Sequence, residues 1–320
     1  MTGAAGVAEA AGTTRTTGTA DMAGIAINSD VGEGFGAWGP ADEGPLLDQV
    51  TAANVACGFH AGDPDILRRT CAASAARGVA IGAQVSYRDL AGFGRRFVDV
   101  PAPTLVNELL YQMGALDVFA RLAGSRISYV KAHGALYNVA ARHGGHAAAI
   151  VEAVSLFDRR LPLLCQPRTE VWTRAVEAGL RPLAEGFVDR GYTDEGLLVP
   201  RSQPGALITD PDEAARRAVL MARTGTVVSV SGRTVDIAPE GGALAALCVH
   251  SDTPGAVAIA AAVRAGLAAA GIESRTPADV ASPVAVASTV SATSAASAGS
   301  TVGASGASGA GAAGGTETGR

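Results

Sequence analysis

The chain has 320 residues, 48% of them hydrophobic, and a net charge of −5 at pH 7. This length and composition suffice for a full-sized core, in one large α/β domain or two small ones. The charge supplies no basic surface, so we expect neither nucleic acid nor an anionic membrane as a partner. The sequence has no signal-peptide pattern and no long uncharged apolar run, which predicts a cytoplasmic protein.

Composition divides the chain into three parts. Residues 1–23 and 274–320 consist mainly of small residues, with too few large side chains to offset the entropy of ordering. We therefore expect a disordered leader and a disordered tail around one domain, residues 24–273. The cysteines are widely spaced in apolar surroundings, which predicts buried free thiols rather than disulfides or a zinc site. They are Cys57, Cys71, Cys165 and Cys248.

Short apolar strands alternate with helical patterns along this domain. Helix starts are indicated where a capping residue precedes proline, as at Asp63, Asp210 and Thr253. Alternation over Thr226–Ile237 predicts a hairpin. The repeated strand–helix units predict a parallel sheet, and their number favours a closed (β/α) barrel over an open sheet. The expected strands are Ile25–Asp30, Ala52–Cys57, Val79–Ala83, Ile127–Val130, Leu161–Cys165, Pro182–Ala184 and Leu244–Val249.

A glycine-rich loop, residues 32–39, follows the first strand and formally matches G-x-G-x-x-G. A dinucleotide site needs a helix that opens at the third glycine, and Pro40 and Pro45 argue against one. Asp30 and Glu33 lie at the strand end and in this loop. Two close carboxylates suit a general base and a ligand for metal or phosphate, although such loops also use acids to cap turn amides.

The loop after the second strand carries His60 and Asp63. They suit metal binding or acid–base chemistry, because His60 has no helical periodicity that would hide it in a core. Asp63 is also explained as the N-cap of the next helix. His250 repeats the strand-end pattern after the last strand. In contrast, His143 and His146 lie in a Gly-rich approach to a helix, and we expect them to be solvated.

Lys131 is the only lysine in the chain, at the end of the fourth strand. Arginine cannot replace a compact ammonium whose pKa burial can lower, so a single lysine suggests a required position. Retention on a solvated turn is the alternative. His133 follows two residues later, on the same side if the strand continues. Tyr137 either donates a phenolic hydrogen bond or packs.

Six separate blocks carry a further signal: residues 28–36, 54–63, 92–96, 131–138, 199–206 and 249–255. Taken together and in this order, they resemble the LamB/YcsF family. The similarity covers Ile25–Ile272. Where many members read Gly-Ala-His-Pro, residues 82–85 read Gly-Ala-Gln-Val, which removes an imidazole that a metal site would use. Where many read Lys-Pro-His, residues 131–133 read Lys-Ala-His.

This resemblance implies a modified TIM-like (β/α) barrel similar to the glycoside hydrolase/deacetylase fold. It also implies ATP-dependent opening of 5-oxo-L-proline (pyroglutamate) to L-glutamate, in a complex with B and C subunits. ATP, with or without magnesium, is the implied co-substrate. The chain has no Gly-x4-Gly-Lys-Ser/Thr loop, so its ATP binding is atypical or shared with the partners.

The implied reaction needs a base for water, an acid for the leaving nitrogen and cations for phosphate. We assign Asp30 as the base and His60 or His133 to proton transfer. Lys131 and Arg201 are assigned to the substrate carboxylate or the phosphate. The other candidates for binding substrate or phosphate are Glu33, Asp63, Tyr137, Gln203, His250 and Asp252.

Two other functions stay open. A metal-dependent amide or N-acyl deacetylase would use Asp30, His60 and His133 as ligands around an activated water. A non-catalytic subunit would bind the cyclic substrate and pass it on. Bound zinc and activity without ATP would indicate the first function, whereas 5-oxoproline binding without ATP turnover would indicate the second.

Overall fold

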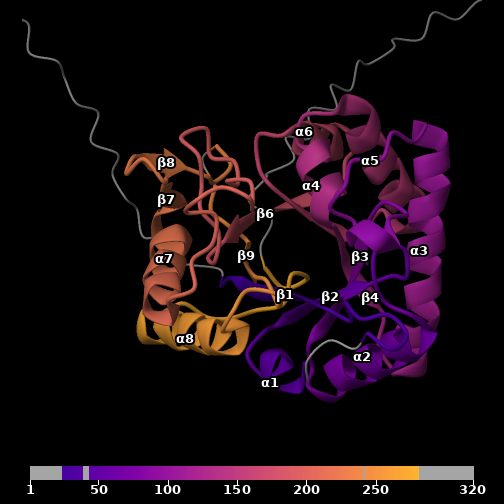
Figure 1. Ribbon diagram of the computed structural model, residues 1–320, viewed down its shortest axis with the longest axis horizontal. Helices are drawn as coiled ribbons and strands as arrows, with labels where there is room; N and C mark the ends of the chain where they lie inside the picture. The colour runs from indigo at the N-terminus through magenta and orange to yellow at the C-terminus, as the bar shows by residue number, and fades with distance from the viewer. Residues whose placement is uncertain (1–23, 39–42, 241, 281–320) are drawn as a thin grey trace, which may run out of the picture. The chain divides into compact units, whose positions relative to one another are not determined.

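The structure is a computed structural model that describes residues 24–38, 43–240 and 242–280. Within this part, a closed barrel of parallel strands runs in the order β1-β2-β3-β4-β5-β6-β9 (Figure 1). The closed parallel barrel confirms the predicted fold class. Its strands are β1 (Ala26–Val31), β2 (Ala52–Ala56), β3 (Ala80–Val85), β4 (Ile127–Ala132), β5 (Pro162–Cys165), β6 (Arg181–Phe187) and β9 (Ala246–Val249).

Helices surround the barrel. Figure 1 shows α3 along one side of it and the packed pair α7 and α8 on the opposite side. The predicted hairpin is confirmed as the antiparallel pair β7 (Thr226–Val228) and β8 (Thr234–Asp236). The helices are α1 (Gly44–Leu47), α2 (Pro64–Ala76), α3 (Ala102–Leu122), α4 (Gly134–Ala140), α5 (Gly144–Asp158), α6 (Glu170–Glu177), α7 (Pro211–Thr224) and α8 (Ala256–Ala269), with a 3-10 turn at Leu90–Gly92.

The barrel strands are buried on both faces, as their near-continuous apolar sequences predict. Side chains alternate between the helix layer and the interior, so residues two apart share a face. On β1 this alternation turns Asn28 and Asp30 toward the same side. Polar side chains from other strands meet them there, and these contacts build the site described below. The four cysteines are buried and free, as predicted.

Strand β6 is longer than the sequence predicts. The expected strand ended at Ala184, but Glu185–Phe187 continue it by pairing with Ala246–Cys248 of β9. The apolar run ends before the strand does, because Glu185 is a strand residue whose side chain pairs with Lys131 inside the barrel. The last helix begins later than expected, at Ala256, after Gly255 in a left-handed conformation (φ 80°).

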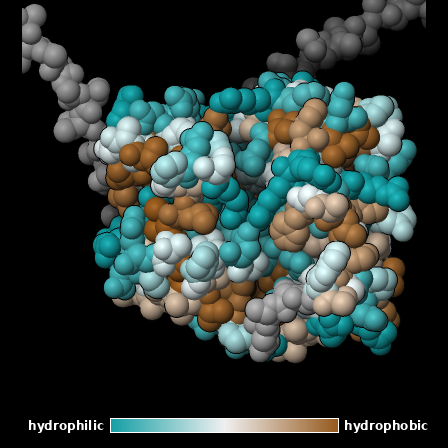
Figure 2. Space-filling view, in the orientation of Figure 1, coloured by the Kyte–Doolittle hydropathy of each residue, from teal (hydrophilic) through white to brown (hydrophobic). Residues whose placement is uncertain are grey.

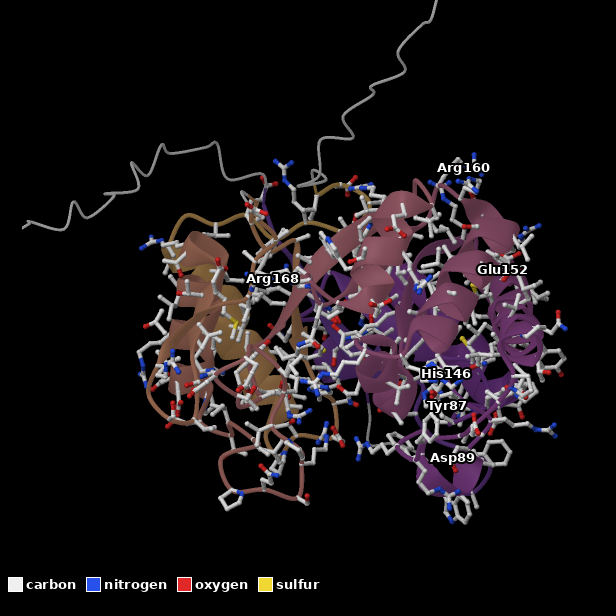
Figure 3. All side chains as sticks on the ribbon, turned by 90° about the horizontal axis from the view of Figure 1, so that it is seen from above. Tyr87, Asp89, His146, Glu152, Arg160 and Arg168 are labelled. Carbon is white, nitrogen blue, oxygen red and sulfur yellow. The ribbon has the colours of Figure 1, made fainter. Side chains whose placement is uncertain are left out.

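His146 is buried, so the expectation that it is solvated is wrong. The Tyr87 hydroxyl lies 2.7 Å from His146 Nδ1, and the two residues are neighbours in Figure 3. Local sequence could not predict this burial, because Tyr87 lies 59 positions away from His146 in the chain. His143 is exposed, and its Nδ1 accepts the His146 backbone N–H at the start of α5.

The barrel also holds the segment that follows its last helix. The backbone N–H of Arg275 donates to Ile25 O at 2.9 Å, and Val280 is buried. The predicted leader, residues 1–23, and the rest of the predicted tail, residues 281–320, lie outside the described residues. No helix in the described ranges has the length and apolarity to cross a membrane. On the face drawn in Figure 2, hydrophilic and hydrophobic residues are interspersed.

Candidate active site

Lys131 lies inside the barrel and binds groups from three other strands. Its Nζ donates to Glu185 Oε1 on β6 at 2.7 Å, to Asn28 Oδ1 on β1 at 3.0 Å and to Cys248 Sγ on β9 at 3.1 Å. Asp30 Oδ1 is 3.8 Å away. Burial alone would lower the pKa of Lys131. The nearby Cys248, Glu185 and Asp30 raise it by more, so the net pKa lies well above its ordinary value. This direction favours the charged ammonium, so Lys131 supplies positive charge inside the barrel.

Asp30 is held by an amide from the neighbouring strand. Asn54 Nδ2 donates to Asp30 Oδ1 and to Asn28 Oδ1, both at 2.8 Å. The Tyr129 hydroxyl donates to Asn54 Oδ1 at 2.7 Å and so orients that amide. Asp30 also lines the cavity described below. One carboxylate oxygen is thus anchored, and the other lies 3.9 Å from His133 Nδ1.

A second cluster joins the loops after β1, β2 and β4 through Gln84 on β3. Gln84 Nε2 lies 3.0 Å from His133 Nδ1 and donates to Glu33 Oε1 at 3.2 Å. Gln84 Oε1 lies 3.2 Å from His60 Nε2. His133 Nε2 lies 3.0 Å from Phe93 O. Because the carbonyl of Phe93 only accepts, His133 carries its proton on Nε2, and Gln84 donates to its Nδ1.

The titratable groups of this cluster favour their neutral forms. Burial lowers the pKa of His133 to about 3. Burial, with His133 next to it, holds the pKa of His60 well below its usual value. Burial raises the pKa of Glu33 well above normal, and the nearby Asp30 and Asp252 raise it further.

The same cluster contains a possible set of metal ligands. Ligand atoms of Glu33, His60 and His133 all lie within 4.8 Å of one another, and His60 Nδ1 is buried without a hydrogen-bond partner. The structure groups Glu33, rather than the predicted Asp30, with the two histidines. Neutral imidazoles and a carboxylate are a donor set that zinc accepts. However, the Gln84 amide already donates to two of the candidate ligand atoms.

Arginines form the rim of the site. Arg95 and Arg201 both pair with Asp252, Arg201 Nη2 at 3.2 Å from Asp252 Oδ1. Arg190 is buried and donates to the backbone carbonyls of Val199 at 2.7 Å and Ala206 at 3.0 Å. Since carbonyls do not neutralise a guanidinium, Arg190 leaves net positive charge at the rim.

A cavity of about 420 Å³ lies at the carboxyl ends of the strands, between these clusters and the rim. In parallel barrels this is the end where ligands bind. A wider hollow of about 790 Å³ opens at the amino ends, near Thr51 and Val79, and contains none of the predicted residues. The residues that line the cavity include Asp30, Arg95, Lys131, His133, Tyr137, Gln166, Phe187, Arg190, Arg201 and His250.

The structure brings together most of the predicted site residues. His60 and Glu33 lie beside His133, and the Tyr137 hydroxyl donates to Glu185 Oε2 at 3.1 Å. Asp63 serves as the N-cap of α2, accepting from Ile66 N at 2.9 Å, and does not line the cavity. Gln203 is exposed and also lies outside the cavity lining.

Several site residues were not predicted. Glu185, Asp189 and Arg190 follow a short apolar run, the same signal that pointed to Asp30 and Lys131. Asn28 could have been found from its position two residues before Asp30 on one strand face. Gln84 had no signal as a bridging residue, because its partners come from three separate loops. The remaining site residues that the sequence did not predict are Asn54, Arg95 and Cys248.

The fold and the cavity define a (β/α)-barrel protein with a cavity lined by charged side chains at the carboxyl ends of its strands. The chain belongs to the LamB/YcsF family, whose model matches residues 25–282. It is 52% identical over 250 residues to a Kocuria rhizophila protein named as the A subunit of 5-oxoprolinase, covering 78% of this chain and 97% of that protein. A Streptomyces avermitilis protein of the same name is 53% identical over 248 residues, with the same coverage.

A solved structure resembles the whole barrel. The lactam utilization protein from Thermus thermophilus matches with a TM-score of 0.74 and 40% sequence identity. The match covers 79% of this chain and 99% of that one. The barrel described here is therefore shared with that protein over nearly its full length.

Proposed function

We propose that this protein is the A subunit of a 5-oxoprolinase, which opens 5-oxo-L-proline to L-glutamate with ATP and acts with B and C subunits. The observation that carries the proposal is the 52% identity over 97% of a protein bearing that name. An ATP-consuming reaction fits the cytoplasmic location that the sequence predicts.

The cavity has the properties that this substrate needs. Its volume of about 420 Å³ lies within the usual range for small-molecule sites, about 300–1,000 Å³. The substrate's carboxylate and a transferred phosphate are both anionic, and Arg190, Arg201 and Lys131 supply the matching positive charge. Because Lys131 already donates to three protein groups, we assign it a long-range electrostatic role and leave direct contacts to the arginines.

Chemically, a five-membered lactam is a resonance-stabilised amide. Phosphorylation of its carbonyl oxygen by ATP makes the ring carbon electrophilic, and water then attacks it. We assign the proton of that water to Asp30, which lines the cavity and is held in place by Asn54. The buried neutral His60 and His133 fit a positioning role better than the proton transfer assigned from sequence. We place the ATP site in part on the partner subunits, because the chain lacks a phosphate-binding P-loop.

The deciding experiment mixes this chain with its candidate B and C partners and measures ATP-coupled glutamate formation, omitting each component in turn. Activity that requires this chain, 5-oxoproline and ATP supports the proposal. Asp30→Asn in an assembled complex should abolish glutamate release, and normal turnover would refute the base role.

One alternative has a structural observation in its favour. The Glu33, His60 and His133 group suits a metal-dependent amide hydrolase, in which a bound divalent ion would polarise an amide carbonyl or a water. Stoichiometric zinc in the purified protein, with turnover that is lost to chelator and needs no ATP, would favour this alternative.

A further inference from the structure

Asp189, which is buried, pairs with the partly exposed His250 at the ends of neighbouring strands. The carboxylate of Asp189 accepts hydrogen bonds from His250 Nδ1 at 3.0 Å, from the His250 backbone N–H at 3.0 Å and from Thr253 Oγ1 at 2.6 Å. Burial raises the pKa of Asp189, but His250 and these hydrogen bonds lower it more, to about 2. The ionised carboxylate can only accept, so His250 Nδ1 carries a proton.

The other ring nitrogen of His250 is available to a ligand. The His250 ring stacks on Phe187, with 5.4 Å between centroids and 18° between planes, which fixes its orientation. His250 lines the same cavity as Asp30 and Lys131, and no described residue makes a hydrogen bond to its Nε2. A histidine with a carboxylate on Nδ1 and a free Nε2 is the usual arrangement of a general acid or base.

We propose that His250 is the catalytic acid that protonates the leaving ring nitrogen, and that Asp189 is its positioning residue. This inference rests on the proposed function and names a proton donor that the reaction needs. The step begins with a proton on each ring nitrogen of His250. As the bond between the carbonyl carbon and the ring nitrogen breaks, the electron pair stays on nitrogen and the carbon is left as an acyl phosphate, which a second water converts to the carboxylate and inorganic phosphate. The proton moves from His250 Nε2 to that nitrogen, and Asp30 holds the proton taken from water. His250 is left neutral, with its Nδ1 proton still bonded to Asp189.

The other histidines of the site cannot take this role. Both ring nitrogens of His133 are engaged, by Gln84 and by Phe93 O. His60 is fully buried and does not line the cavity. Of the described histidines near the cavity, His250 alone combines a carboxylate partner with an open nitrogen.

The test uses the assembled complex with His250→Ala. Loss of a general acid costs about 10²–10⁴-fold in turnover, and we expect a loss in this range with 5-oxoproline binding retained. The vacated space should admit imidazole, and rescue should follow the concentration of the protonated form as pH is varied. Rescue that follows neutral imidazole, or turnover within a few-fold of wild type, would overturn the proposal. His143→Ala, an exposed histidine outside the cavity, is the matched control and should keep full turnover.

A second variant tests the pair as a unit. Asp189→Asn should lower turnover without changing substrate binding, and it should add little in the His250→Ala background, because Asp189 acts through His250. Additive losses would refute the positioning role. If His250→Ala does not fold, His250→Gln takes its place, and full turnover by that variant overturns the proposal. A wild-type complex without ATP-coupled glutamate formation would refute the proposed function itself, whereas an active wild type with an equally active His250 variant would refute this pair alone.

Discussion

The imidazole rings of His60 and His133 are stacked, with 4.0 Å between their centroids and 14° between their planes. Both side chains are buried, and burial holds the pKa of each below that of a free histidine. A proton on either ring would place a charge in a dry site beside a second imidazole. The folded protein therefore binds fewer protons at these positions than the unfolded chain does.

This difference predicts acid sensitivity. An unfolded histidine protonates near pH 6.5, whereas His133 does so at about 3. Stability should therefore fall as pH drops below about 6.5, by up to about 1.4 kcal/mol per pH unit for each such histidine. The free energy of unfolding is measured in urea on chelator-treated protein. Between pH 6 and 5 it should fall less steeply with pH for His133→Gln than for wild type. For His143→Gln it should not, and equal slopes for all three proteins would contradict the prediction.

Lys131→Met should strongly destabilise the fold. The substitution leaves Glu185 buried without its cation, and breaking a buried pair in this way costs about 3–5 kcal/mol. Urea unfolding measures the loss, and adding Glu185→Gln should recover part of it. Arg160→Met removes an exposed pair with Asp158 and serves as the control, with little expected change. A loss as small as the control's would show that the pair is not buried in solution.

Gln84→His should increase zinc affinity. The amide now donates to Glu33 and His133, whereas an imidazole there would add a fourth ligand to those residues and His60. Dialysis against zinc followed by metal analysis should find one ion per chain at lower free zinc for the variant. His133→Asn in the same background should remove it. Equal zinc binding by wild type would mean that the amide does not compete with a metal.

Gly94→Ala should be more damaging than Gly78→Ala. Both glycines have a positive φ, of 65° and 67°, so the backbone penalty is similar. A Cβ on Gly94 would lie 2.5 Å from Ser86 Oγ and 2.8 Å from His60 Cβ, whereas one on Gly78 meets nothing within 4 Å. Overpacking of this kind costs about 1–3 kcal/mol. Thermal unfolding should show that difference in stability. Equal losses of stability in the two variants would indicate that the loop over the histidines shifts to accommodate the added methyl group.

The sequence predicts the barrel well because its strands and most of its helix caps have local signals. Asp30, Lys131 and His133 were identified in the same way, since each ends an apolar run. Glu185 was not placed inside the barrel, because its position depends on pairing with β9, which lies far away in the chain. Gln203 matches a family block, but its side chain is exposed on a loop outside the cavity lining. Local patterns thus predict which elements form, but partners distant in sequence decide which side chains meet.

The Lys131 ammonium binds Asn28, Glu185 and Cys248, which are separated from it by 103, 54 and 117 positions in the chain. Contacts between such distant segments cannot form until the barrel ring has nearly closed. We therefore expect them to be absent from the transition state for folding. Weakening the contacts of Lys131 should then accelerate unfolding and leave the refolding rate almost unchanged. Lys131 would thus set how long the folded state persists before it unfolds.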